Sequence, residues 1–430
     1  MARSIRVAAV QLRAHDPHDF QRSLGTIVDA ATRAAKNADL VVLPEGTFPG
    51  YVLAGARFDE AAIDGALDRL RDLARATGTV IVTGAVTQSD GSLRNSAIVI
   101  DTNGSTAGCV DKVFLWHFDR LWFEPGDRIA PVDTAIGKLG IMICADGRIP
   151  TIARALVDRG AEMLVMPTAW VTTGRNPRAL ENVQADLLAR VRARENGVPF
   201  VAANKCGTEL GMVAYCGKSQ IVGAGGETLS IACEGDPQTL EAVLTLDSAR
   251  PYRAATLAAP ARRAAARGLP LRLAISADSL PSDVDARLTL LDDAYALAPF
   301  DDVRLALLDR AIPTANVGDA EMSDPAGLVG YRRAGYALAV WTAGERSAWT
   351  EPIARARALE LRMYVIVFDN AVRRAFAVDP DGNVIAGTFE GYRLASFSLD
   401  PRRTMETAVA PGTDIADGLQ RVDAIVDRKD

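Results

Sequence analysis

The first 250 residues alternate short, almost continuously apolar runs with amphipathic stretches, and this alternation restricts the fold more than any other feature. Short runs of Val, Ile, Leu and Ala suit strands that are buried on both faces. Stretches with apolar residues three and four positions apart suit helices that cover such a sheet. The predicted strands are 5–12, 40–45, 80–86, 95–101, 138–144, 163–168 and 199–204, and the predicted helices are 20–37, 59–77, 150–159 and 178–196. The pattern predicts an α/β fold in which helices cover the sheet.

The composition of the chain changes after residue 247, and residues 251–270, rich in Ala, Arg and Pro, form the predicted linker. The predicted domains are 1–250 and 271–430. The second of them repeats short pieces of the first in the same order. The matched pairs are 271–277 with 5–12, 307–313 with 43–49, 319–325 with 144–150, 338–343 with 164–169 and 355–370 with 190–205. We therefore expect a truncated, degenerate copy of the first domain.

Charge and hydropathy argue against a nucleic-acid or membrane partner. The net charge is −6 and the basic and acidic residues are interspersed, while every apolar run is far shorter than the ~20 residues that cross a bilayer. The N-terminal residues enter a strand pattern directly, without the apolar core of a secretory signal. The 5 cysteines are odd in number and irregularly spaced, which disfavours disulfides and structural zinc. These features predict a cytoplasmic protein without a structural zinc site.

Three residues could act together in catalysis. Glu45 and Cys144 end predicted strands, and Lys112 lies between them in the chain. A nucleophilic thiol needs a nearby base and a positive potential, which Glu45 and Lys112 would supply. Lys112 and the backbone N–H of Ala145 would stabilise an oxyanion, and Glu45 would carry protons. Each residue also has a structural interpretation, because a strand-end cysteine is usually a small core residue and Glu and Lys are usually solvated.

The three residues resemble the Glu–Lys–Cys triad of the nitrilase superfamily. Five ordered segments carry the resemblance: LPEGTFPGY at 43–51, VDKVF at 110–114, GIMICADGRIP at 140–150, RARENGVPFVAAN at 192–204 and GKSQIVGAGGETL at 217–229. The resemblance implies an αββα four-layer sandwich that pairs with a second sandwich. It also implies cofactor-free hydrolysis of a carbon–nitrogen bond, with an intermediate on the cysteine and water as the second substrate.

The residues after the cysteine bear on the branch of the superfamily. Nitrilases generally have Trp and Glu there, whereas this chain has Ala145 and Asp146, which favours amides and N-carbamoyl compounds. Arg148 lies where carbamoylases carry an arginine that holds the substrate carboxylate, and it would grip an acid group with two parallel hydrogen bonds. The alternative is a solvent-facing or interface arginine. Trp170 would wall the substrate pocket or belong to the core.

Residues 117–127 resemble the same region of N-carbamoyl-D-amino-acid hydrolases, where a second acid is structurally important. Asp119 occupies the position of that acid, although the family has the longer Glu there, and Glu124 is the alternative source of the acid. His117 matches a histidine of the same family. It could equally be a packed, hydrogen-bonded residue.

The second copy has lost the triad. Asp309 aligns with Glu45 and Asp319 with Cys144, and too few residues separate them for a lysine segment, so we expect the copy to be inactive. It would dock as an internal pseudo-partner or form an accessory lid, and a homo-oligomer is a further alternative. Rival functions are acyl transfer to an amine, nitrile hydrolysis and a non-enzymatic interaction role.

Overall fold

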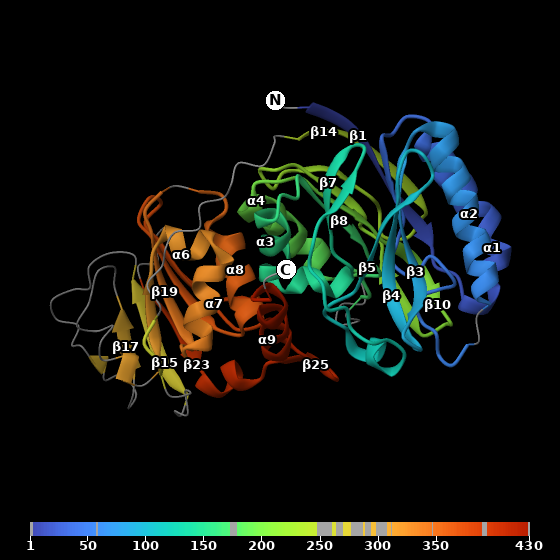
Figure 1. Cartoon of the computed structure of the whole chain (residues 1–430). Helices are drawn as coiled ribbons and strands as arrows, with labels where there is room; N and C mark the ends of the chain where they lie inside the picture. Colours follow the sequence, from blue (N-terminus) through green and yellow to red (C-terminus); the bar gives the residue numbers. More distant parts are fainter. Residues whose placement is uncertain are drawn as a thin grey trace. The chain divides into compact units, whose positions relative to one another are not determined.

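The computed structural model describes residues 3–56, 59–172, 179–246, 260–263, 270–276, 287–288, 294–297, 308–310, 312–345, 347–388 and 394–428. The chain divides into two compact units (Figure 1), the first formed by Met1–Tyr252, Ala410–Thr413 and Gly418–Asp430 and the second by Arg253–Val409 and Asp414–Asp417. The sequence placed the whole of 271–430 in the second domain. The end of the chain instead belongs to the first unit, because its side chains pack there.

Two sheets make up the centre of the first unit. The eight-stranded sheet has the order β11-β10-β1-β2-β3-β4-β5, with β14 paired to β1, and the six-stranded sheet has the order β13-β12-β9-β8-β7-β6. The strands of the first sheet are β1 Arg3–Arg13, β2 Leu40–Val42, β3 Val80–Ser89, β4 Ser92–Ile100, β5 Thr106–Asp111, β10 Lys205–Glu209, β11 Val213–Cys216 and β14 Gln238–Leu246. Those of the second are β6 Val132–Thr134, β7 Gly137–Ile141, β8 Met163–Pro167, β9 Phe200–Ala203, β12 Gln220–Val222 and β13 Thr228–Ile231.

Helices cover the outer face of each sheet, which gives the predicted αββα order of layers (Figure 1). Helices α1 (Phe20–Ala35) and α2 (Glu60–Thr77) lie on the eight-stranded sheet, and α3 (Pro150–Asp158) and α4 (Ala189–Asn196) lie on the six-stranded sheet. A buried apolar cluster joins α1 and α2 to strands β1, β2 and β3. The bounds of α1, α2 and α3 confirm the helices expected from apolar spacing.

Two strands end earlier than the sequence suggested, and both ends position site residues. β2 stops at Val42 because Pro44 has no N–H to donate to a ladder. β7 stops at Ile141, and Cys144 has a φ of +45°, in the left-handed region that a strand cannot contain. Glu45 and Cys144 follow these two strand ends, and both are buried.

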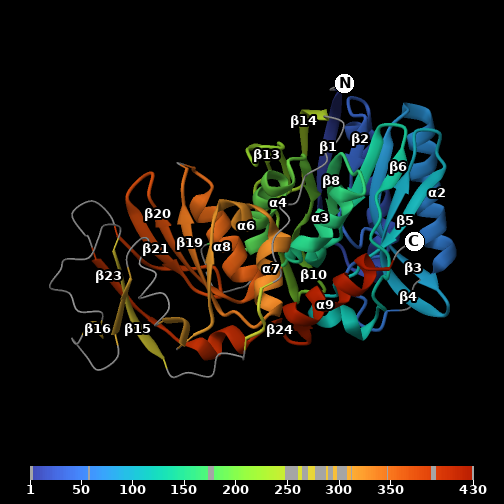
Figure 2. The ribbon, with the colours of Figure 1, turned by 60° about the vertical axis from the view of Figure 1, so that its left-hand side comes forward.

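The second unit contains a four-stranded sheet and a five-stranded sheet, with helices on the five-stranded one (Figure 2). Its strands are β15 Leu271–Ser276, β16 Arg287–Leu288, β17 Ala294–Leu297, β18 Thr314–Val317, β19 Leu338–Ala343, β20 Tyr364–Asp369, β21 Arg374–Val378, β22 Val384–Gly387 and β23 Leu394–Leu399, and its helices are α6 Asp319–Ser323, α7 Pro325–Arg333 and α8 Thr350–Leu361. Strands β18 to β20 are parallel and β21 and β22 follow antiparallel, the same order and directions as β7, β8, β9, β12 and β13.

A buried arginine–glutamate pair occurs in one helix of each unit. In α4, Arg192 binds Glu195 at 2.7 Å and donates to the carbonyl of Gly147 at 3.0 Å. In α8, Arg357 binds Glu360 at 2.9 Å and donates at 3.1 Å to the carbonyl three residues after Asp319. Gly147 likewise lies three residues after Cys144. The sequence match between the two segments thus coincides with a match of buried contacts.

Gly84, a residue of β3, packs closely against the Glu45 segment. A Cβ on Gly84 would lie 2.5 Å from the backbone nitrogen of Gly46 and 2.6 Å from Cα of Glu45. We expect Gly84→Ala to lower the free energy of unfolding by roughly 3 kcal/mol, because backbone atoms cannot move aside. Chemical denaturation measures the change. The control is Gly65→Ala in α2, where nothing lies within 4 Å of the added Cβ, and a wild-type result for Gly84→Ala would contradict this packing.

Candidate active site

Glu45, Lys112 and Cys144 come together at one edge of the two sheets, although the chain separates them widely. Glu45 follows β2, Lys112 follows β5 and Cys144 follows β7. The ammonium of Lys112 lies 2.8 Å from Oε1 of Glu45, and all three residues are buried, with at most 5% of their surface exposed. The three residues come from strands of both sheets, because β2 and β5 belong to the eight-stranded sheet and β7 belongs to the six-stranded sheet.

The ammonium of Lys112 lies between two carboxylates. Besides Glu45 it contacts Oδ2 of Asp119 at 2.6 Å, and the side chains of all three residues are inaccessible to solvent. Burial alone would lower the pKa of Lys112, but Asp119 and Glu45 outweigh burial and hold that pKa well above its usual range. Burial and the charge of Asp119 raise the pKa of Glu45, which Lys112 only partly offsets. A carboxylate with a raised pKa is a stronger base.

Cys144 is the first residue of the short 3₁₀ helix η3 (Cys144–Arg148). Burial, followed by the charge of Glu45, raises the pKa of its thiol to about 12, and Lys112 lowers it only in part. The expected positive potential therefore does not ionise the thiol in the substrate-free site. Ala145 lies at the start of η3, where backbone N–H groups have no acceptor within the helix.

Asp146 anchors the cysteine segment to the lysine segment. Its Oδ1 accepts from the backbone N–H groups of Val113, at 3.1 Å, and Phe114, at 2.7 Å, and its Oδ2 accepts from that of Ile143 at 2.9 Å. Burial raises the pKa of Asp146 to about 6. The residue was singled out in the sequence for its difference from nitrilases, and these contacts were not anticipated.

The second acid of the site is Asp119 and not Glu124. Asp119 is fully buried in the 3₁₀ helix η2 (His117–Leu121), whereas Glu124 is exposed. Oδ1 of Asp119 and Oε2 of Glu45 are buried and have no hydrogen-bond partner among the described residues. Two buried acceptor atoms of the Lys112 cluster are thus open to a bound group. The shorter aspartate still reaches the ammonium of Lys112, at 2.6 Å.

His117 and Arg148 were candidate binding residues. The ring of His117 packs edge-on against Phe118, with 5.1 Å between ring centroids. Arg148 lies over the ring of Trp116 at 4.4 Å, and its Nε is buried without a hydrogen-bond partner. Burial lowers the pKa of Arg148 to about 10. The charge of Cys144 raises this pKa and so offsets part of the effect of burial. Within the described part of the chain, no carboxylate pairs with this guanidinium.

Trp170 and two residues that the sequence did not reveal complete the surroundings. Trp170 is fully buried and its indole Nε1 has no partner among the described residues. Asn95 donates to Oε1 of Glu45 at 2.7 Å, and Tyr51 places its ring 5.5 Å from the ammonium of Lys112. Asn95 is the first residue of the predicted strand 95–101, where a polar side chain gives no signal of a role in the site.

A second buried lysine–carboxylate pair fixes the backbone after Glu45. Lys205 lies 3.0 Å from Oε2 of Glu209 and donates to the carbonyl of Gly46. Oε1 of Glu209 accepts from the backbone N–H groups of Tyr51 and Val52, both at 2.7 Å. This network was missed because its members carry no spacing pattern.

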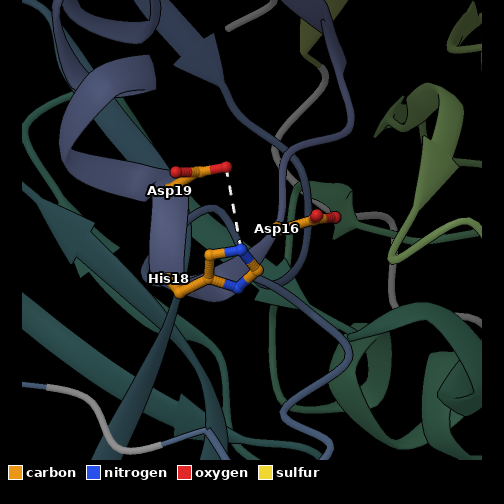
Figure 3. Close-up of side chains that lie close together, drawn as sticks. All are labelled: Asp16, His18 and Asp19. Atoms are coloured by element: carbon orange, nitrogen blue, oxygen red, sulfur yellow. Dashed lines mark ion pairs between the residues drawn. The ribbon is translucent and has the colours of Figure 1, made fainter.

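Figure 3 shows Asp16, His18 and Asp19, the one group of possible metal ligands found in the described ranges. Oδ1 of Asp16 already accepts from the backbone of Leu210 at 2.6 Å, and His18 and Asp19 are half exposed, 3.8 Å apart. Such surface groups are common, and nothing buried points into this one. In the helices that the structure describes, no segment is long and apolar enough to cross a membrane.

The family model of the carbon–nitrogen hydrolases matches residues 6–254. A probable nitrilase of Schizosaccharomyces pombe is 30% identical over 242 residues, covering 55% of this chain and 86% of the relative. The N-carbamoylputrescine amidase of Solanum tuberosum is 29% identical over 275 residues, covering 58% of this chain and 89% of the relative.

The fold is also similar to that of solved enzymes. A crystal structure of an amidase from Nesterenkonia sp. has a TM-score of 0.51 and 30% identity, covering 58% of this chain and 94% of that one. Another structure of the Nesterenkonia sp. AN1 amidase shows acrylamide added to its active-site cysteine, with a TM-score of 0.50, 30% identity and coverage of 56% and 92%. With the buried Glu45, Lys112 and Cys144, these likenesses establish that the chain belongs to the carbon–nitrogen hydrolase family.

Proposed function

We propose that the first unit hydrolyses an amide or N-carbamoyl compound through a thioester on Cys144, in the cytoplasm and without a cofactor. One observation carries the proposal: the solvent-free cluster of Glu45, Lys112 and Asp119 beside a buried thiol. Two carboxylates keep the lysine charged, and one carboxylate with a raised pKa is available to take a proton.

In the first half-reaction, the carboxylate of Glu45 takes the thiol proton as sulfur bonds to the carbonyl carbon. Because the pKa of the resting thiol is raised to about 12, proton transfer accompanies the attack and does not precede it. The ammonium of Lys112 and the N–H of Ala145 donate to the oxyanion. The carbon–nitrogen bond then breaks, Glu45 returns the proton to the leaving nitrogen, and ammonia or an amine departs.

In the second half-reaction, Glu45 takes a proton from water as the water oxygen attacks the thioester. The carbon–sulfur bond breaks, the proton returns to sulfur, and the carboxyl product leaves. One base therefore serves both halves. Acyl transfer would differ only in that an amine replaces water in this step, and nitrile hydrolysis in that the first intermediate is a thioimidate.

The test is ammonia release from primary amides, N-carbamoyl amino acids and nitriles. We expect release from an amide or carbamoyl compound, and we expect Cys144→Ala to reduce kcat by about 10⁴-fold or more, because the nucleophile is lost. The control is Cys206→Ala, which removes another fully buried thiol and should leave kcat near the wild-type value.

Other outcomes separate the rivals. Ammonia release from nitriles alone would indicate a nitrilase. Consumption of an ester or amide only in the presence of an amine acceptor would indicate an acyltransferase. No Cys144-dependent turnover of any compound would favour a non-enzymatic role for the scaffold and would overturn the proposal.

We further propose that the substrate carries an acid group that Arg148 binds. Arg148 is half-buried, and its buried Nε has no hydrogen-bond partner among the described residues, so a substrate carboxylate would supply the missing charge. Its guanidinium carbon lies 4.4 Å from the centre of the Trp116 ring. Trp170 would form part of the pocket wall.

For Arg148→Gln we expect KM for acid-bearing substrates to rise about 10- to 100-fold, because a charge-assisted hydrogen bond is lost. KM for neutral amides should change little, so steady-state kinetics with a matched acidic and neutral substrate measures the effect. An equal loss for both substrates would show that Arg148 does not recognise an acid group.

We also propose that the second unit is a degenerate, inactive copy of the first. The shared order of strands and the repeated arginine–glutamate pair support this reading. Asp319, at the cysteine position, accepts from the indole of Trp341 at 2.8 Å and from the backbone of Gly344 at 3.2 Å. Asp309, at the glutamate position, is bound by Arg263 at 2.6 Å.

Because both aspartates already have partners, we expect Asp319→Asn to leave kcat and KM unchanged, and steady-state kinetics checks this. A large loss of kcat would contradict an inactive second unit. The internal pseudo-dimer stays a prediction: a molar mass near 45.7 kDa in solution would agree with it, whereas twice that mass would indicate a homo-oligomer.

A further inference from the structure

The segment between Lys112 and Gly126 carries the acid that holds the catalytic lysine. Within it, Asp119 binds Lys112 and also accepts from the backbone of Trp116 at 3.0 Å, so the position of η2 sets the position of this carboxylate. The turn into η2 is unfavourable for the backbone, since His117 has a φ of +46°. Something outside the segment must therefore stabilise this conformation.

The end of the chain supplies that stabilisation. The hydroxyl of Thr413 accepts a 2.6 Å hydrogen bond from the backbone N–H of His117, a contact between residues 296 positions apart. Arg421 donates to the carbonyls of Pro125, at 3.3 Å, and Gly126, at 2.7 Å, at the other end of the same segment. Both ends of the segment that carries Asp119 are thus bound by residues of the C-terminal part of the first unit.

The fit between these elements is close. A Cβ on Gly418 would lie 2.5 Å from the ring of Phe114 and 2.9 Å from the side chain of Ile149. Gly418 belongs to α9 (Ile415–Val426), which lies beside the η2 segment in Figure 2. Its residues Leu419 and Val422 are buried, and Thr413 is only 1% exposed. Water therefore cannot replace the hydroxyl of Thr413 without rearrangement.

We propose that residues 410–413 and 418–428 are a positioning element of the active site, and that Thr413 is a positioning residue for Asp119 and, through it, for Lys112. This inference rests on the proposed function. It concerns a part of the chain that lies beyond residues 6–254, where the family model matches. The catalytic unit is then incomplete with the matched residues alone, although these contain the whole triad.

The experiment compares Thr413→Val with Thr413→Ser in the full-length protein. Valine keeps the shape but removes the acceptor, and we expect kcat to fall about tenfold with little change in KM. As Asp119 moves from Lys112, the pKa of the lysine should fall, because Asp119 is a cause of its raised value. The alkaline limb of the pH–kcat profile should therefore shift to lower pH. Serine restores the acceptor and should restore both.

The matched control is Thr79→Val. Thr79 is also 1% exposed and donates to the carbonyl of Ala38 at 2.9 Å, beside α1. The Thr79→Val variant should lower the melting temperature about as much as Thr413→Val does, but it should leave the pH–kcat profile unchanged. If Thr413→Val does not fold, Arg421→Gln provides a second variant. We expect it to lower kcat and to shift the alkaline limb of the pH–kcat profile to lower pH, in both cases by less than is expected for Thr413→Val.

A second readout separates this inference from the proposed function. Acrylamide alkylation of Cys144, followed by peptide mass spectrometry with Cys144→Ala as the blank, needs no substrate. If wild type is alkylated but hydrolyses nothing, the proposed function fails, while a slower alkylation in Thr413→Val still supports the positioning role. If Thr413→Val keeps the wild-type alkylation rate and pH profile, Thr413 has no positioning role.

Discussion

The ammonium of Lys112, enclosed between two carboxylates without access to water, is the interaction on which the rest of the active site depends. Removing one partner of a buried ion pair typically destabilises a protein by about 3–5 kcal/mol, because the remaining charge is left unpaired. Loss of any one of Glu45, Lys112 and Asp119 is therefore expected to disturb the other two. The three residues come from the end of β2, the end of β5 and η2. Their pairing therefore fixes three separate segments of the chain, and Asp146 ties the cysteine segment to them.

The state of Cys144 follows from the same burial. A thiol whose pKa is raised to about 12 is protonated at neutral pH and reacts slowly with chance electrophiles. In the proposed mechanism, Glu45 removes the proton only when an electrophilic carbon is in place to receive the sulfur. Under that mechanism, the low reactivity of the resting thiol contributes to selectivity.

Much of the first unit could be predicted from the sequence, because strands and helices have periodic apolar patterns. The sequence also placed Glu45 and Cys144 at the ends of predicted strands, although these strands, β2 and β7, belong to different sheets. Contacts without a period could not be predicted. Asn95 reaches Glu45 across 50 residues and Thr413 reaches His117 across 296. Neither contact is encoded by spacing, and only the packed structure brings these side chains together.

The first unit is discontinuous in the sequence: its last residues follow the whole of the second unit. The second unit therefore lies, in the sequence, between two parts of the first unit. Cleavage of the chain within the second unit would leave Glu45, Lys112 and Cys144 together on one fragment. It would place Thr413 and Arg421, which bind the two ends of the Asp119 segment, on the other fragment.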